Sequence, residues 1–152
     1  MTAINHALTG SIIGFVVVNP FLAIPLALLS HFILDMLPHF GNQKDKDWIK
    51  SKWFKLVLGI DIILTIIFGL TLLILHPTNY LIAFICALIA TSPDLIYFKN
   101  FIRANRNKKI KTNLLIKFSS VIQWYEKPTG LIIEGIYLIL SVSILGLILH
   151  LG

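Results

Sequence analysis

The sequence predicts an all-α, polytopic membrane protein that forms a single domain over residues 1–152. Hydrophobic residues make up 57% of the chain and charged residues 13%, and the mean hydropathy is +0.85. A soluble domain is typically about 45–50% apolar and about 25% charged. The apolar residues fall in runs of near-membrane length, and all 13 Lys and Arg residues fall in two short stretches, residues 44–55 and 99–127.

Five apolar runs predict five transmembrane helices, of which the first and fourth are short for a hydrocarbon core of about 30 Å. In chain order they cover residues 4–18, 21–37, 54–75, 80–90 and 131–151. The fourth can extend past Pro93, because Ser92 suits an N-cap and proline suits the first position of a helix that restarts there. Small residues, including Gly10 and Gly14, predict tight packing of the first helix.

The basic residues predict the orientation of these helices. Five lie within residues 44–55 and eight within residues 99–127, and two helices separate the segments, which places both on one side of the membrane. Lys and Arg concentrate in cytoplasmic loops. We therefore expect a multi-pass protein of the cytoplasmic (inner) membrane with a cytoplasmic N-terminus and an external C-terminus. The net charge of +6 then indicates contact with membrane lipids and requires no nucleic acid.

Residues 114–125 add a further predicted element. Their apolar side chains recur along one helical face while Lys117 lies on another, a pattern typical of an amphipathic helix in the membrane interface. The single cysteine, Cys86, lies in an apolar run and excludes an intramolecular disulfide framework.

Polar, ionisable residues gather at one end of the predicted bundle. The segment "LSHFILDMLPHFG" carries two histidines and an aspartate at intervals of four. With the orientation above, seven such residues lie toward the cytoplasmic ends of the helices: His6, His31, Asp35, His39, Asp61, Asp94 and Glu134. Ionisable side chains inside a membrane are costly and usually mark a site. This layer is the main functional signal of the sequence.

The chemistry of the layer favours a metal. His31 and Asp35 are separated by four residues on one helix, about 6 Å along its axis, so both can bind one ion or two adjacent ions. Imidazole together with carboxylate suits Zn, Mn or Fe, and hydrolytic centres use such sets to activate water.

Packing roles are the alternative for each of these residues. His31 and Asp35 can form an interhelical hydrogen-bonded pair, and Asp61 can pair with Lys55 or form a hydrogen bond to a neighbouring helix. Asp94 can serve as a plain cap residue, while Glu134 can complement the positive end of the last helix dipole. His6 and His39 can lie at the membrane interface without a ligand role.

The "LSHFILDMLPHFG" segment resembles the SHxxxD block of the YdjM-type, inner-membrane-associated, metal-dependent hydrolases. Asn5-His6 is similar to their early "GH" pair and Pro93-Asp94 to their "PD" aspartate. The resemblance implies a metal site built from His6, His31, Asp35 and Asp94. The chain lacks the HRxxTH motif of these proteins, and its Pro-Asp pair follows the SHxxxD block, whereas theirs precedes it.

Three functions are compatible with these features. The first is a metal-dependent hydrolase that acts on an anionic phosphoester or lipid head group at the cytoplasmic face. In this hypothesis a divalent transition metal, with Zn preferred over Mn or Fe, is bound by ligands drawn from His6, His31, Asp35, His39 and Asp94, and Asp61 or Glu134 is catalytic. The second is a metal-ion or proton transporter. The third is a non-enzymatic membrane protein whose polar layer only specifies helix packing.

Overall fold

The computed structural model describes residues 1–42, 48–106, 117, 121–122 and 125–151. It is mostly helical, which confirms the all-α class. The long elements are α1 (Ala3–Val17), α2 (Pro20–Asp35), α3 (Lys52–Leu75), α4 (Tyr80–Thr91), α5 (Asp94–Asn105) and α7 (Gly130–Leu151). A 3-10 turn, η1 (Trp48–Lys50), precedes α3, and the two-residue strands β1 (His39–Phe40) and β2 (Glu126–Lys127) pair in parallel.

Local sequence explains where the helices begin and end. The Asn19 side chain accepts a hydrogen bond from the Phe21 amide at the start of α2, and the Ser51 side chain caps α3 in the same way. The predicted break in the fourth helix is present, since α4 ends at Thr91 and α5 begins at Asp94. Ser92 is not the N-cap that we predicted, because its hydroxyl donates back to the Ile89 carbonyl and extends the end of α4.

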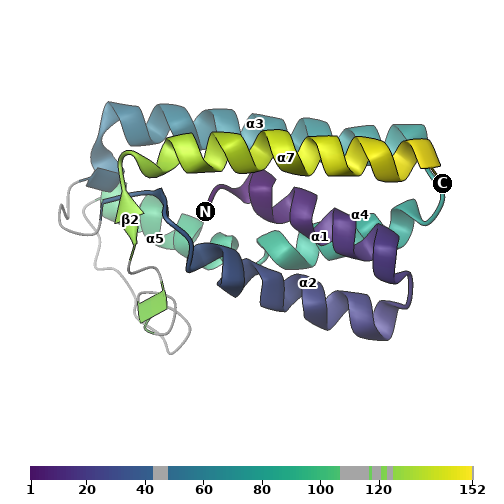
Figure 1. The fold of residues 1–152 in the computed structure, drawn as a ribbon. Helices are drawn as coiled ribbons and strands as arrows, with labels where there is room; N and C mark the ends of the chain where they lie inside the picture. Colours follow the sequence, from purple (N-terminus) through teal and green to yellow (C-terminus); the bar gives the residue numbers. More distant parts are fainter. Residues whose placement is uncertain (43–47, 107–116, 118–120, 123–124, 152) are drawn as a thin grey trace.

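Helix α1 is the centre of the bundle. It contacts α2, α3, α4 and α7, and Figure 1 shows it between α7 and α2. Its closest neighbour is α4: a Cβ atom added at Gly10 would lie 2.4 Å from the Cys86 carbonyl oxygen, and one at Gly14 would lie 2.5 Å from Ala83 Cα. Only glycine permits this approach, as expected for a packing motif of small residues.

Two helices are long and apolar enough to cross a membrane, namely α3 and α7. Only 11% of the most apolar stretch of α3 and 17% of that of α7 is buried inside the protein. Their outward faces carry large apolar side chains such as Ile63, Ile66, Ile139 and Leu147. Such surfaces are rare in soluble monomers. These two helices indicate membrane association, whereas the shorter α1, α2 and α4 fall below the length of a span by themselves.

The two ends of the molecule differ. In Figure 1 the C-terminus lies at one end, while α5, β2 and the start of α3 gather at the other, on the side where the N-terminus lies. The residues with site chemistry belong to this second end. The amphipathic helix that we predicted over residues 114–125 falls almost entirely outside the described residues.

Candidate metal centre

Three candidate ligands from three helices meet at one point. His6 of α1, His31 of α2 and Asp94 of α5 each offer an atom, and these atoms lie within 4.8 Å of one another. The two histidines are fully buried, with imidazole centroids 4.1 Å apart. The sequence places these residues 25 to 88 positions apart, so the fold brings them together.

Asp35 completes this group, which we call the His–Asp cluster and define as His6, His31, Asp35 and Asp94. Asp35 Oδ1 lies 3.2 Å from His6 Nε2, and Asp35 Oδ2 lies 3.4 Å from His31 Nε2. The Met1 amino group donates a hydrogen bond to Asp35 Oδ1. A positive group therefore already balances the Asp35 charge, and a metal ion bound here would compete with that amine.

A backbone contact sets the orientation of His31. Its Nδ1 lies 2.8 Å from the Ala90 carbonyl oxygen, which can only accept, so Nδ1 carries the proton. The lone pair of His31 is then on Nε2, the atom that faces Asp35. Metal-binding histidines usually have their second ring nitrogen anchored in this way.

The cluster contains buried polar atoms without hydrogen-bond partners. These atoms are the two ring nitrogens of His6, the Nε2 of His31 and the Oδ2 of Asp94. Burial of unpaired polar atoms costs about 1–3 kcal/mol each, so native proteins rarely tolerate several together. A divalent cation would satisfy such atoms, and two imidazoles with carboxylates are suitable ligands for Zn, Mn or Fe. The residues present therefore fit a metal ion.

Asp94 lies at the start of α5, outside the two helices that can span a membrane. Burial raises the pKa of its carboxyl to about 8, although the nearby Met1 amino group acts in the opposite direction. The carboxylates of Asp35, Asp61 and Glu134 raise this pKa further. A cation bound beside this carboxyl would stabilise its ionised form.

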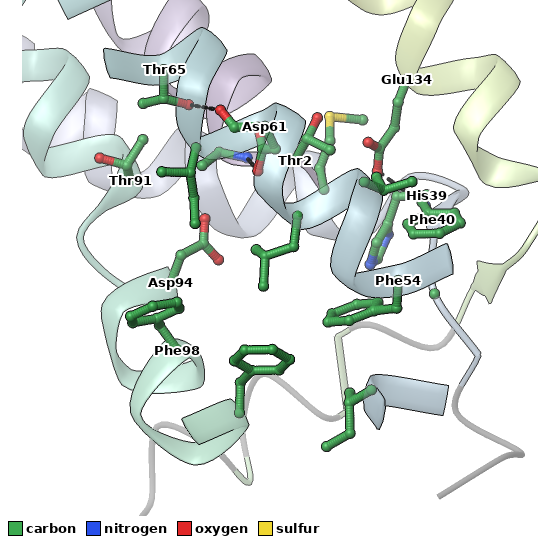
Figure 2. Close-up of a pocket in the computed structure, with 18 of the residues that line it drawn as sticks. Thr2, His39, Phe40, Phe54, Asp61, Thr65, Thr91, Asp94, Phe98 and Glu134 are labelled. Carbon is green, nitrogen blue, oxygen red and sulfur yellow. Dashed lines mark hydrogen bonds between the residues drawn. The ribbon is translucent and has the colours of Figure 1, made fainter. Parts of the chain in front are cut away.

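A cavity of about 710 Å³ adjoins the cluster. Asp94 lines it together with the other predicted site residues His39, Asp61 and Glu134. Figure 2 shows Asp61, Asp94, Thr65 and Thr91 in its upper half, whereas the rings of Phe54 and Phe98 lie in its lower half. Asp94 is thus shared between the His–Asp cluster and a cavity large enough for a small molecule.

Asp61 forms hydrogen bonds to a neighbouring helix, one of the two packing roles expected for it. Its two carboxylate oxygens accept hydrogen bonds from the backbone amides of Ala3 and Ile4, at 2.8 and 2.9 Å. These amides are among the unpaired donors at the start of α1, so Asp61 of α3 caps a helix other than its own. This contact holds the helix that carries His6 in place.

Glu134 and His39 lie on the α7 side of the cavity. Glu134 Oε1 accepts a hydrogen bond from the Phe40 amide, while Glu134 Oε2 is buried without a partner. His39 Nδ1 donates to the Leu37 carbonyl, and its Nε2 lies 3.6 Å from Glu126 Oε1. None of the three ligand atoms that meet at the cluster belongs to His39.

The structure thus divides the seven predicted residues into two groups. His6, His31, Asp35 and Asp94 form the cluster, whereas His39, Asp61 and Glu134 line the adjoining cavity. The sequence reasoning missed Glu126, which directly follows the predicted amphipathic helix over residues 114–125 and pairs with His39 in the structure. The structure also brings Gly130 close to His39, because an added Cβ at Gly130 would lie 2.1 Å from the His39 carbonyl carbon.

Comparisons of this chain with protein-family models, with curated proteins and with solved structures give no match.

Proposed function

We propose that this protein is a membrane-embedded, metal-dependent hydrolase that acts on a phosphoester or lipid head group at the cytoplasmic face of the inner membrane. The observation that carries the proposal is the His–Asp cluster, whose unpartnered ring nitrogens and Asp94 oxygen adjoin a cavity of about 710 Å³. Asp35 oxygens lie close to His6 Nε2 and His31 Nε2, but a cluster that served packing alone would not leave His6 Nδ1 and Asp94 Oδ2 buried without partners. The resemblance of the SHxxxD segment to YdjM-type hydrolases agrees with this assignment.

The membrane placement rests on exposed apolar surface. We propose that α1, α2 and α4 cross the bilayer together with α3 and α7, because their outward side chains are apolar as well. Phe21 of α2 is 86% exposed, Val16 of α1 is 65% exposed and Leu88 of α4 is 54% exposed. The two basic segments then lie on the cytoplasmic side, next to the cluster.

In this proposal the cluster residues bind the metal and the cavity residues serve the substrate. A bound divalent ion would supply Lewis acidity, which lowers the pKa of water toward about 7 and polarises a phosphoryl oxygen. The hydrogen bond to the Ala90 carbonyl orients His31 for metal binding. Asp61 positions His6 by holding the start of α1. Glu134 is the better candidate for the general base, because its Oε2 is free whereas both Asp61 oxygens accept amide hydrogen bonds.

The far end of the bundle argues against a transport path. A second cavity of about 300 Å³ lies between α3 and α7, and apart from Thr71 it is lined by apolar residues such as Leu72, Leu75 and Leu145. An ion pathway needs polar groups along its length. In the described residues, the ionisable groups of the cavities are confined to the end that holds the cluster.

The test is hydrolysis by the full chain purified in detergent, with p-nitrophenyl phosphate and bis(p-nitrophenyl) phosphate as probes. We expect activity with Zn or Mn, loss of activity with chelator, and loss in His31→Ala. His150→Ala is the matched control, because it removes an exposed histidine at the other end of the bundle. Equal rates with and without metal, or an active His31→Ala variant, would contradict the proposal.

A further inference from the structure

The walls of the large cavity are chiefly apolar. On α3 they include Val57, Leu58 and Ile62, and on α5 they include Leu95 and Phe98. Figure 2 shows Asp61 and Glu134 in the upper part of the cavity wall, and the rings of Phe54 and Phe98 below them. The cavity therefore matches a molecule with a polar group at one end and an apolar body at the other.

The part of the cavity rim that α3 forms faces the surface that we assign to lipid. Ile62 and Ile66 of α3 line the cavity and are 37% and 56% exposed, and Leu95 of α5 is 63% exposed. These side chains contribute both to the cavity wall and to the outer surface of the protein. A gap between two helices with apolar edges is an entry route from a bilayer, because an apolar chain can pass without leaving apolar surroundings.

The charges of the cavity indicate how a head group would be held. Asp61, Asp94, Glu126 and Glu134 line it, and among its described lining residues there is no Lys or Arg side chain. Met1 also lines it, but its amino group is already paired with Asp35. An anionic phosphate would be repelled by these carboxylates unless a cation at the His–Asp cluster reversed the local charge. Binding of a phosphate head group should therefore require metal.

We infer that the substrate is a lipid phosphoester that enters from the bilayer between α3 and α5 and keeps its apolar chain in this gap while its phosphate reaches the cluster. The inference rests on the proposed function and narrows its substrate class from phosphoesters in general to phosphoesters of membrane lipids. A water-soluble phosphoester would not need the apolar rim formed by Ile62, Ile66 and Leu95.

Photo-crosslinking with dodecyl phosphate that carries a diazirine at its fourth carbon tests the inference. The probe is added to metal-loaded full chain in phosphatidylcholine nanodiscs, and labelled residues are mapped by mass spectrometry. We expect labelling of Leu58, Ile62 and Leu95 that excess dodecyl phosphate suppresses and that chelator abolishes. Labelling of the outer face, for example at Ile63, should not be suppressed, because it reports the surrounding lipid.

A matched pair of variants sharpens the test. Leu58→Trp/Ile62→Trp fills the cavity, whereas Leu56→Trp/Ile63→Trp places the same bulk on the exposed face of the same helix. The first should reduce suppressible labelling at Leu95 at least about fivefold, and the second should leave it unchanged, because added volume excludes a ligand only where the ligand lies. Metal content and size-exclusion profile verify that both variants are folded.

The outcomes separate this inference from the proposed function. Labelling that excess dodecyl phosphate does not suppress, in a protein that binds metal and hydrolyses phosphoesters, contradicts the lipid inference alone. This suppression test uses the wild-type chain, so it is valid even if the tryptophan variants do not fold. Suppressible labelling in a protein that neither binds metal nor hydrolyses the soluble probes contradicts the proposed function instead.

Discussion

The Nδ1 nitrogen of His31 lies 2.8 Å from the carbonyl oxygen of Ala90, which ties the histidine of α2 to the last turn of α4. Helix α4 in turn packs on α1 at Gly10 and Gly14, and α1 carries His6. The position of both histidines therefore depends on how closely α1 and α4 approach. This dependence links helix packing to the chemistry of the cluster.

Gly10→Ala should destabilise the protein and disturb the cluster. Its Cβ would lie 2.4 Å from the Cys86 carbonyl oxygen, so α1 and α4 would have to separate, at a cost of about 1–3 kcal/mol. Thermal unfolding in detergent measures the effect as a lower midpoint. Gly135→Ala is the control, because nothing lies within 4 Å of its added Cβ. Equal midpoints for the two variants would show that the approach of α1 to α4 is not tight.

Much of this arrangement could be predicted from the sequence. Runs of apolar residues, ended by Asn19-Pro20 and interrupted at Ser92-Pro93, predict the order and type of the helices. The charge asymmetry of the loops predicts which ends share one side, and this places the ionisable residues in one layer before any contact is known. The apolar runs and the loop charges suffice for these predictions, because the runs can be read along the chain and the charges act across the whole membrane.

Other features depend on long-range contacts that no local pattern specifies. The Asp61 contact with the start of α1 joins residues 57 and 58 positions apart, and the His39 contact with Glu126 arises from the pairing of β1 with β2. The volume and lining of the cavity follow from how α3, α5 and α7 are placed around it. Sequence spacing carries no information about these distances.

Asp61→Asn should reduce stability while leaving the metal in place. The substitution removes one of the two oxygens that accept the Ala3 and Ile4 amides, and loss of a helix cap costs about 0.5–2 kcal/mol. The unfolding midpoint in detergent measures the first effect, and elemental analysis measures the second. A variant of normal stability that loses its metal would identify Asp61 as a ligand and contradict the capping role.

Glu134→Gln should retain metal but lose activity. Glu134 Oε2 is buried and unpartnered at the cavity, and Gln keeps the acceptor for the Phe40 amide while it loses the basic oxygen. General-base catalysis contributes about 10²–10⁴-fold, so the rate with p-nitrophenyl phosphate should fall by at least about a hundredfold. Glu126→Gln serves as the comparison, and its rate should change little. A fully active Glu134→Gln enzyme would rule out the proposed base.

The proposed orientation in the membrane predicts a pattern of cysteine accessibility. In a Cys86→Ala background, cysteines at Lys50 and Lys99 should resist an impermeant thiol reagent that is added outside intact cells, because both positions belong to the basic segments. A cysteine at Asn79, between α3 and α4, should react. Labelling of position 50 or 99 before lysis would reverse the proposed orientation.

The metal content of the purified protein tests the central claim most directly. The wild-type chain, prepared in detergent without chelator, should contain about one equivalent or more of a divalent transition metal by elemental analysis. Asp35→Asn should remain folded and lose that metal, because Asn keeps the shape of Asp but not its charge. Less than about a tenth of an equivalent in the wild type, with no uptake of added Zn or Mn, would show that the His–Asp cluster is a packing element and not a metal centre.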